Sequence, residues 1–162
     1  MEHKAIYPGT FDPITLGHQD IARRAADIFS EVVVAVADFP GKKQLFFTTQ
    51  ERVAMAQEVF ADAPNIRVMA FSGLLMAFVQ AQGTRVVLRG LRAASDFEYE
   101  FQLAGMNRSM FPEVETMFLT PDEKYMFISA SLVREVAMLG GDVSQFVSPP
   151  IAEQLKCKIQ AK

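Results

Sequence analysis

The residues best suited to chemistry lie in one loop near the start of the chain, Pro8-Gly9-Thr10-Phe11-Asp12-Pro13-Ile14-Thr15-Leu16-Gly17-His18. The loop runs into a predicted helix, and the first turn of a helix attracts phosphate through its unpaired N–H groups and partial positive charge. Gly17 has no side chain, so a phosphate can approach this turn closely, and His18 can aim a ring N–H at it. Thr10 and Thr15 add hydroxyl donors. A lone Gly-His pair is more often an ordinary first turn, but the whole string predicts a phosphate site.

Basic and hydroxyl residues recur after other predicted strands. Lys42 and Lys43 follow the second strand, Arg89-Gly90-Leu91-Arg92 follows the fourth, and Ser129-Ala130-Ser131 precedes a helix after the fifth. Guanidinium groups at a strand end can grip phosphate oxygens, and the free N–H groups of a starting helix suit both a capping serine and a phosphate. Each group alone is more often a solvated loop or a plain cap. Together they predict a phosphate-binding rim.

Strand and helix candidates alternate along the chain. The predicted strands are short, nearly continuous apolar runs, as in parallel strands covered on both faces; they are His3–Tyr7, Val32–Ala37, Ile66–Phe71, Arg85–Leu88 and Glu115–Leu119. The predicted helices are Gly17–Phe29, Thr49–Phe60, Gly73–Gln82, Asp96–Met110, a helix-rich stretch Ser129–Leu139 and a final helix that starts at Ser148-Pro149-Pro150. Thr48 and Glu51 have the spacing of a capping box.

This alternation predicts an α/β fold, namely a single Rossmann-like domain over residues 1–162 with a doubly wound, parallel five-stranded sheet. Helices are expected on both faces of the sheet, followed by a C-terminal helical segment. In open α/β sheets ligands bind beyond the carboxyl ends of the strands, where the strand order reverses. The predicted phosphate rim lies at those ends.

Composition excludes several classes of function. The 162 residues carry 16 basic and 19 acidic side chains, a formal charge of −3, so the basic surplus of a nucleic-acid-binding protein is missing. Cys157 is the single cysteine and cannot form an internal disulfide. No signal-peptide pattern or membrane-spanning apolar run is present, which predicts a cytoplasmic protein without a membrane partner. His3 and His18 are the only histidines, and no metal-ligand cluster is expected.

An acidic–aromatic run, Asp96-Phe97-Glu98-Tyr99-Glu100-Phe101, follows the two arginines. Its helical spacing predicts that Phe97 and Phe101 face the core or a subunit interface. Glu100 is more often a solvated helix charge than a ligand, but it lies close in sequence to the arginines.

Taken together, these strings resemble the bacterial phosphopantetheine adenylyltransferases, a family in the nucleotidyltransferase α/β phosphodiesterase superfamily. The resemblance runs in order through Ala5–Pro13, Thr15-x-Gly17-His18, Arg89–Arg92, Asp96–Glu100 and Phe127–Val133. It implies that ATP and 4′-phosphopantetheine become dephospho-coenzyme A and pyrophosphate, with Mg²⁺ bound mainly through the ATP phosphates. It also implies a homohexamer that coenzyme A inhibits by feedback.

The resemblance assigns roles by motif position. It makes His18 the transition-state stabiliser, assisted in catalysis by Lys42 and Arg92. It places Thr10, Lys42 and Arg89 on the phosphate of phosphopantetheine and Leu75 along the pantetheine arm. The residues it assigns to ATP are Thr10, Phe11, His18, Gly90, Leu91, Arg92, Glu100, Tyr125, Met126, Phe127, Ile128, Ser129, Ala130 and Ser131. Ala130 stands where the family usually has serine, and the segment Leu45–Thr48 looks one residue longer than the family's spacing.

Adenylyl transfer to a phosphate needs no general base, which agrees with the absence of a recognisable base from the sequence. A phosphate monoester has a second pKa of about 6, so the nucleophile is largely a dianion at neutral pH and needs no general base. A sister transferase that uses nicotinamide mononucleotide, or CTP with an alcohol phosphate, fits the His18 loop but not the Arg89–Glu100 strings. A regulatory nucleotide-binding module without turnover would have less need of His18, Lys42 and the arginines. A redox or flavin protein is disfavoured, because the chain has no dinucleotide fingerprint and no Cys-x-x-Cys.

Overall fold

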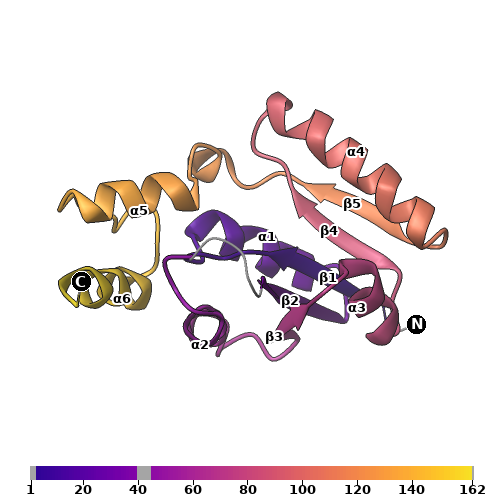
Figure 1. Cartoon of the computed structure of the whole chain (residues 1–162), viewed down its shortest axis with the longest axis horizontal. Helices are drawn as coiled ribbons and strands as arrows, with labels where there is room; N and C mark the ends of the chain where they lie inside the picture. Colours follow the sequence, from indigo (N-terminus) through magenta and orange to yellow (C-terminus); the bar gives the residue numbers. More distant parts are fainter. Residues whose placement is uncertain (1–2, 40–44, 162) are drawn as a thin grey trace.

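Parallel strands form a sheet at the centre of the molecule (Figure 1). The computed structural model describes residues 3–39 and 45–161, and within them the sheet has five strands in the order β3-β2-β1-β4-β5. Their bounds are β1 Lys4–Gly9, β2 Glu31–Asp38, β3 Ile66–Ser72, β4 Val86–Gly90 and β5 Glu115–Leu119. The strand order reverses between β1 and β4, as in the predicted doubly wound fold.

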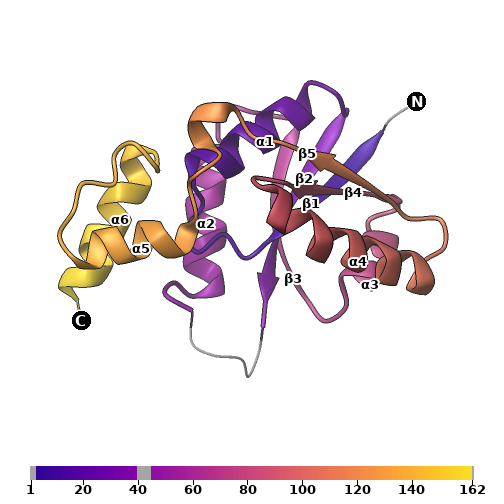
Figure 2. The same cartoon turned by 90° about the horizontal axis from the view of Figure 1, so that it is seen from above.

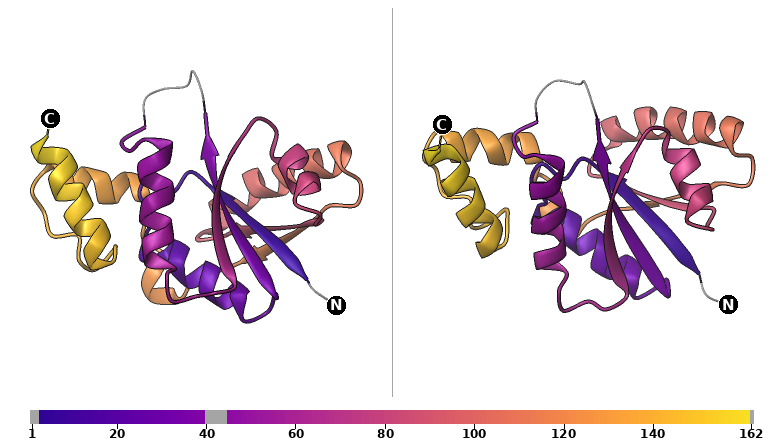
Figure 3. Two further views of the ribbon diagram at one scale, coloured as in Figure 1. Left: turned by 90° about the horizontal axis from the view of Figure 1, so that it is seen from below. Right: turned by 60° about the horizontal axis from the view of Figure 1, so that its bottom comes forward.

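Helices cover both faces of this sheet. Their bounds are α1 Leu16–Ala26, α2 Thr49–Val59, α3 Leu75–Ala81, α4 Ala94–Met110, the short 3₁₀ helix η1 Glu123–Tyr125, α5 Ala130–Met138 and α6 Pro149–Gln160. Helices α1 and α2 lie on one side of the sheet and α3 and α4 on the other (Figure 2). Helices α5 and α6 form a pair beside α2 (Figure 3). Within the part of the chain described, no helix combines the length and apolar character needed to cross a membrane.

Two buried clusters explain why the sheet is covered on both sides. Alternate residues of a strand point to opposite faces. Val32, Val34 and Val36 of β2 therefore join the larger cluster, under α1 and α2, whereas Val33 and Ala35 join a smaller cluster that contains α3 residues. The near-continuous apolar strands thus bury both faces, and the predicted fold class is confirmed.

Local capping signals also hold in the structure. The Thr48 hydroxyl accepts the Glu51 N–H at 3.2 Å, and the Glu51 carboxylate accepts the Thr48 N–H at 2.7 Å, so the predicted capping box starts α2. The Ser129 hydroxyl accepts the Leu132 N–H at 3.2 Å and caps α5. Both prolines at the start of α6 lie in its first turn, where a missing N–H costs nothing.

Several predicted boundaries need correction. The predicted strands His3–Tyr7 and Arg85–Leu88 stop too early, because β1 continues to Gly9 and β4 to Gly90. The predicted helix Gly17–Phe29 is too long, since α1 ends at Ala26. The helix predicted from Gly73 begins at Leu75, because Gly73 has a φ of 80° and cannot be helical.

Candidate functional site

The sheet opens between β1 and β4 at their carboxyl ends. Strand β1 pairs with β2 from Lys4 to Gly9 but with β4 only at Ala5 and Ile6. The next residue of β1 that faces β4 is Pro8, which has no N–H to donate to a ladder. Arg89 of β4 instead donates to the Pro8 carbonyl at 3.4 Å. The proline therefore ends the ladder where the strand order reverses, and the strands separate there.

A cavity of about 450 Å³ occupies this opening, in the size range of small-molecule sites. Two helix N-termini reach it, since Thr15, Gly17 and His18 of the α1 start and Ser129–Ser131 of the α5 start line its wall. The predicted site residues that line it are Thr10, Phe11, His18, Arg89, Gly90, Arg92, Ile128, Ser129, Ala130 and Ser131. Residues from opposite halves of the chain thus meet as the rim hypothesis predicts.

Gly17 leaves open space beside this wall. A side-chain carbon at Gly17 would meet its nearest neighbours, Thr15 and Tyr125, at an ordinary 3.7 Å. Protein packing therefore does not require glycine there, although glycine weakens a helix by about 1 kcal/mol relative to alanine. The space fits the predicted close approach of a phosphate to the first turn of α1.

The orientation and tautomer of His18 are fixed by the start of α1. The Thr15 N–H donates to His18 Nδ1 at 3.0 Å, and the Thr15 hydroxyl accepts the His18 N–H at 3.4 Å. Because Nδ1 accepts a proton in this bond, the proton of the neutral ring lies on Nε2. Among the described residues no acceptor is bonded to Nε2, so this N–H can donate to a ligand in the cavity that His18 lines.

His18 is also held neutral. Burial, aided by the positive charge of Arg92, lowers the pKa of His18 from 6.5 to about 4. At neutral pH the ring is therefore a hydrogen-bond donor without a charge. Such a group can stabilise a developing negative charge but supplies no proton as a charged acid would.

Arg89 and Glu100 form a bidentate pair at the cavity edge. Arg89 Nε and Nη2 each donate to a Glu100 oxygen at 2.7 Å, and the Glu100 residue is only 8% exposed. Burial lowers the pKa of Arg89, but the hydrogen bonds and charge of Glu100 raise it by more, so the guanidinium stays charged. Glu100 thus contacts Arg89 and is absent from the cavity wall. Its charge is buried and paired, unlike the solvated helix charge that its sequence context favours.

The loop after β1 contains a strained turn. Phe11 has a φ of 50°, a left-handed conformation that costs a residue with a side chain roughly 1–2 kcal/mol. The turn buries the Phe11 ring edge-on between Tyr7 and His18, with centroid distances of 5.4 and 5.0 Å. Burial also raises the pKa of Tyr7, which keeps this cavity-lining phenol protonated.

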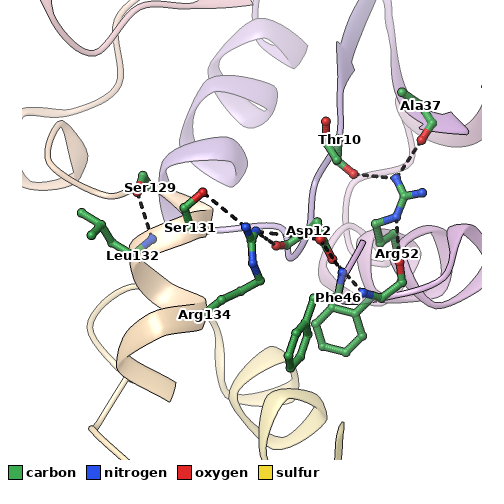
Figure 4. Close-up of polar contacts among 10 residues, drawn as sticks. Thr10, Asp12, Ala37, Phe46, Arg52, Ser129, Ser131, Leu132 and Arg134 are labelled. Atoms are coloured by element: carbon green, nitrogen blue, oxygen red, sulfur yellow. Dashed lines mark hydrogen bonds and ion pairs between the residues drawn. The ribbon is translucent and has the colours of Figure 1, made fainter. Parts of the chain in front are cut away.

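Three polar residues of the site were not predicted from the sequence. Asp12 is buried and accepts the N–H groups of Phe46 and Phe47, both at 2.9 Å. Arg134 donates to the Asp12 carbonyl at 2.5 Å and to the Ser131 hydroxyl at 3.3 Å (Figure 4). Arg52 of α2 is 2% exposed and donates to the Thr10 carbonyl. Only the position of Asp12 inside the phosphate loop signalled a role.

Other predicted site residues lie off the cavity wall. Leu75 begins α3 and packs against the smaller apolar cluster. Leu91 donates its N–H to Leu119 of β5. Tyr125 ends η1, and Met126 and Phe127 lie between η1 and α5, where Phe127 is 66% exposed. Lys42 lies outside the described residues.

Arg92 joins the two sides of the opening. Its guanidinium donates to the Ile128 carbonyl at 2.6 Å, just before the serine that caps α5. This contact connects the end of β4 with the start of α5. The contact joins residues 36 positions apart in the chain, and both of them line the cavity.

Comparisons with known proteins agree with this geometry. Residues 6–136 match the cytidylyltransferase-like family. A phosphopantetheine adenylyltransferase of Nitrosospira multiformis is 64% identical, covering 98% of this chain and 96% of the relative, and one of Methylobacillus flagellatus is 64% identical over 96% and 97%. A structure described as a nicotinate-nucleotide adenylyltransferase from Vibrio parahaemolyticus shares the fold, with a TM-score of 0.69 and 17% identity over 96% of this chain and 99% of that one. The chain therefore belongs to the phosphopantetheine adenylyltransferases, within the cytidylyltransferase-like family.

Proposed function

We propose that this protein transfers the adenylyl group of ATP to 4′-phosphopantetheine and releases pyrophosphate, the step of coenzyme A biosynthesis that forms dephospho-coenzyme A. The observation that carries the proposal is the cavity between β1 and β4, where two helix N-termini, a neutral His18 and Arg89 converge. Relatives that are more than 60% identical over nearly the whole chain carry the name of this activity.

The reaction needs positioned donors and no general base. An oxygen of the phosphopantetheine phosphate attacks the α-phosphorus of ATP, a new P–O bond forms, and the bond to the bridging oxygen of pyrophosphate breaks. In this proposal the Nε2–H of His18 and the first turn of α1 bind the oxygens on which charge grows. The neutral ring suits this task, because it donates throughout the reaction without losing its proton.

Thr10, Lys42 and Arg89 would hold the phosphate of 4′-phosphopantetheine. The Thr10 and Arg89 positions on either side of the opening support this assignment, since both residues line the same cavity. Arg92 and the start of α5 would bind the nucleotide, as would the segment Tyr125–Ser131. Glu100 would act on the nucleotide pocket by holding Arg89, and Leu75 would contact the pantetheine arm.

Magnesium would accompany the nucleotide. In the parts of the chain described, residues 3–39 and 45–161, no group of three or more His, Cys, Asp or Glu side chains could hold a metal ion. The Asp12 carboxylate, which belongs to the phosphate loop, already accepts two backbone N–H groups. Mg²⁺ prefers phosphate oxygens and water, so it would be bound mainly by ATP and would neutralise phosphate charge.

Coenzyme A would compete for the same cavity, because it contains both an adenylate and a phosphopantetheine arm. The protein would also assemble as a homohexamer through the apolar side chains that α4 and β5 expose. The large apolar side chains exposed on these two elements are Phe97, Tyr99, Phe101, Met106 and Met110 around α4 and Met117 on β5. Several large apolar side chains exposed on neighbouring elements favour burial against further copies.

The test is pyrophosphate release from ATP and Mg²⁺ with a panel of acceptors. The panel contains 4′-phosphopantetheine, nicotinamide mononucleotide and glycerol 3-phosphate, and each is repeated with CTP. We expect release only with ATP and 4′-phosphopantetheine. Release with another pair would keep the phosphate site but reject the substrate, and ATP binding without release by any pair would reject the enzyme.

A further inference from the structure

The turn Thr10–Asp12 is held from two sides by arginines. The left-handed conformation of Phe11 is strained, and a residue stays in such a conformation only where its surroundings hold it there. The turn matters to the cavity, because it carries Thr10 and presses the Phe11 ring against His18. The groups that fix the turn therefore affect two residues of the proposed reaction.

Arg52 holds the entry to the turn. Its Nη1 donates to the carbonyls of Thr10 and Ala37, both at 2.8 Å, and its Nε donates to the Phe47 carbonyl at 3.3 Å (Figure 4). The Thr10 carbonyl belongs to the peptide plane that leads into Phe11. Fixing this plane fixes the rotation on which the left-handed φ of Phe11 depends.

Arg134 holds the exit from the turn. From α5 it donates to the carbonyl of Asp12, the residue after Phe11. The Asp12 carboxylate in turn accepts the N–H groups of Phe46 and Phe47, which lead into α2. The Thr10–Phe11 peptide and the Asp12–Pro13 peptide, which enclose Phe11 and Asp12, are thus bonded to side chains of α2 and α5 (Figure 4).

The contacts of Arg52 are unusual for a buried charge. Its described hydrogen-bond partners are three carbonyls and the Thr49 hydroxyl, and no carboxylate is among them. Burial lowers the pKa of Arg52, although Asp12 and Asp38 partly offset this effect. A buried guanidinium without a bonded carboxylate is a poor source of stability. A role in positioning explains its place better.

We propose that Arg52 and Arg134 are positioning residues, which hold the Phe11 turn so that Thr10 and His18 keep the arrangement required for adenylyl transfer. This inference rests on the proposed function. Arg52 lies off the cavity wall and Arg134 lines it, but the role requires neither of them to touch a substrate. Their effect on turnover passes through Thr10 and His18.

The first experiment compares R52K with R23K. Lysine keeps the charge of Arg52 but cannot bond all of its acceptors. Arg23 is a matched control, because it donates to the Val59 carbonyl at 2.8 Å and so holds the far end of α2. A misplaced catalytic group can cost up to about a hundredfold in rate, so we expect R52K to lower kcat at least about tenfold. R23K should change kcat less than about twofold. An equal loss in both variants would overturn the proposal.

A double-mutant cycle with T10V then separates positioning from general weakening. If Arg52 acts through Thr10, R52K should cost much less in the T10V background than in the wild type. Equal fold losses in both backgrounds would contradict the proposal. If R52K does not fold, as judged by circular dichroism, the same cycle is run with R134K, whose side chain is partly exposed.

Calorimetric binding of ATP to the same variants keeps the two proposals distinguishable. A wild type that releases no pyrophosphate would reject the proposed function. Even then, the proposed positioning of the Phe11 turn by Arg52 predicts that R52K binds ATP more weakly and that R23K binds it as the wild type does. ATP binding that both variants retain at the wild-type level, together with unchanged kcat, would reject the positioning role.

Discussion

His18 receives its orientation, its tautomer and its neutral state from one piece of local structure. The Thr15 N–H that it accepts is a free group of the α1 N-terminus, and burial, aided by the charge of Arg92, lowers the pKa of His18. The sequence indicated a ring N–H near a helix start, and the structure places His18 in the first turn of α1, on the cavity wall. The tautomer could not be predicted, because it depends on one backbone hydrogen bond.

Substitution of His18 tests its role as a donor. We expect H18A to lower kcat by roughly 10²–10³-fold, the loss typical of one transition-state donor, while ATP binding changes little. Steady-state kinetics and ATP calorimetry measure the two quantities. H3A, which removes the other histidine outside the cavity, serves as the control and should retain wild-type kcat. An H18A enzyme with normal kcat would contradict the role.

The lowered pKa of His18 also predicts a pH dependence of stability. Between about pH 6.5 and about pH 4 the unfolded chain binds a proton at His18 that the folded chain does not, so acid favours unfolding in this range. H18Q removes the titration, and glutamine can still accept the Thr15 N–H in the capping box. Melting curves should therefore show the wild type losing stability relative to H18Q as the pH falls from 6.5 to 4. Parallel losses in the two proteins would show that His18 is not held neutral.

Arg52 illustrates which site residues sequence patterns miss. In a helical segment it is indistinguishable from an exposed surface arginine, and nothing local marks it as buried. Its acceptors come from Thr10, Ala37 and Phe47, which meet only when the sheet and α2 assemble. Arg89 and Arg92 were recognisable because they follow an apolar strand, where the fold rule places ligands.

At the level of helices and strands, the cavity depends on the carboxyl end of β1, a boundary that local sequence rules do not predict. Local rules end the first strand before Pro8-Gly9, since neither residue favours a strand interior. In the structure β1 continues, because Pro8 and Gly9 still pair with Ala35 and Val36 of β2. The missing N–H of Pro8 affects only the side facing β4. This asymmetry opens the cavity, and it arises from long-range pairing.

Helix α6 is connected to the same region through a charged contact. Lys158 Nζ lies 2.8 Å from both oxygens of Glu51, the capping-box residue of α2. Burial raises the pKa of Glu51, but the Lys158 and Thr48 hydrogen bonds lower it by more. The contact thus stabilises the fold above the normal pKa of glutamate, and this stabilisation is lost as acid protonates Glu51.

We expect K158M to lower the melting temperature by a few degrees at pH 7, since partly exposed pairs contribute about 1 kcal/mol or less. K156M, which removes a charge from an exposed position of the same helix, should have a smaller effect. The difference between the variants should shrink below about pH 4, as Glu51 becomes protonated. A difference that persists in acid would mean that Lys158 acts by packing instead of by charge.

For the whole molecule, the doubly wound sheet could be predicted because apolar strands alternate with amphipathic helices along the chain. The position of the α5–α6 pair could not, since it depends on contacts such as Arg134 with Asp12, 122 residues apart. The exposed aromatic rings of α4 belong to the acidic–aromatic run that starts at Asp96. Of its two predicted environments for Phe101, core or interface, the structure excludes the core, because Phe101 is 64% exposed.

Assembly through this surface is testable by sedimentation. We expect the wild type to sediment at six times the mass of the chain, and F101E to dissociate, since a charge buried in an apolar interface is strongly unfavourable. L139E is the control, because Leu139 is even more exposed, at 88%, and lies beyond α5. A wild-type monomer, or a hexamer that survives F101E and not L139E, would contradict the proposed interface.

The central claim is that the cavity between β1 and β4 transfers an adenylyl group to a phosphate. The most direct measurement follows the label from ATP carrying radioactive α-phosphorus, in the presence of Mg²⁺ and 4′-phosphopantetheine. The account predicts that the label enters dephospho-coenzyme A, that unlabelled pyrophosphate is released, and that H18A slows both together. Label recovered in AMP or ADP, with none in a pantetheine product, would contradict it.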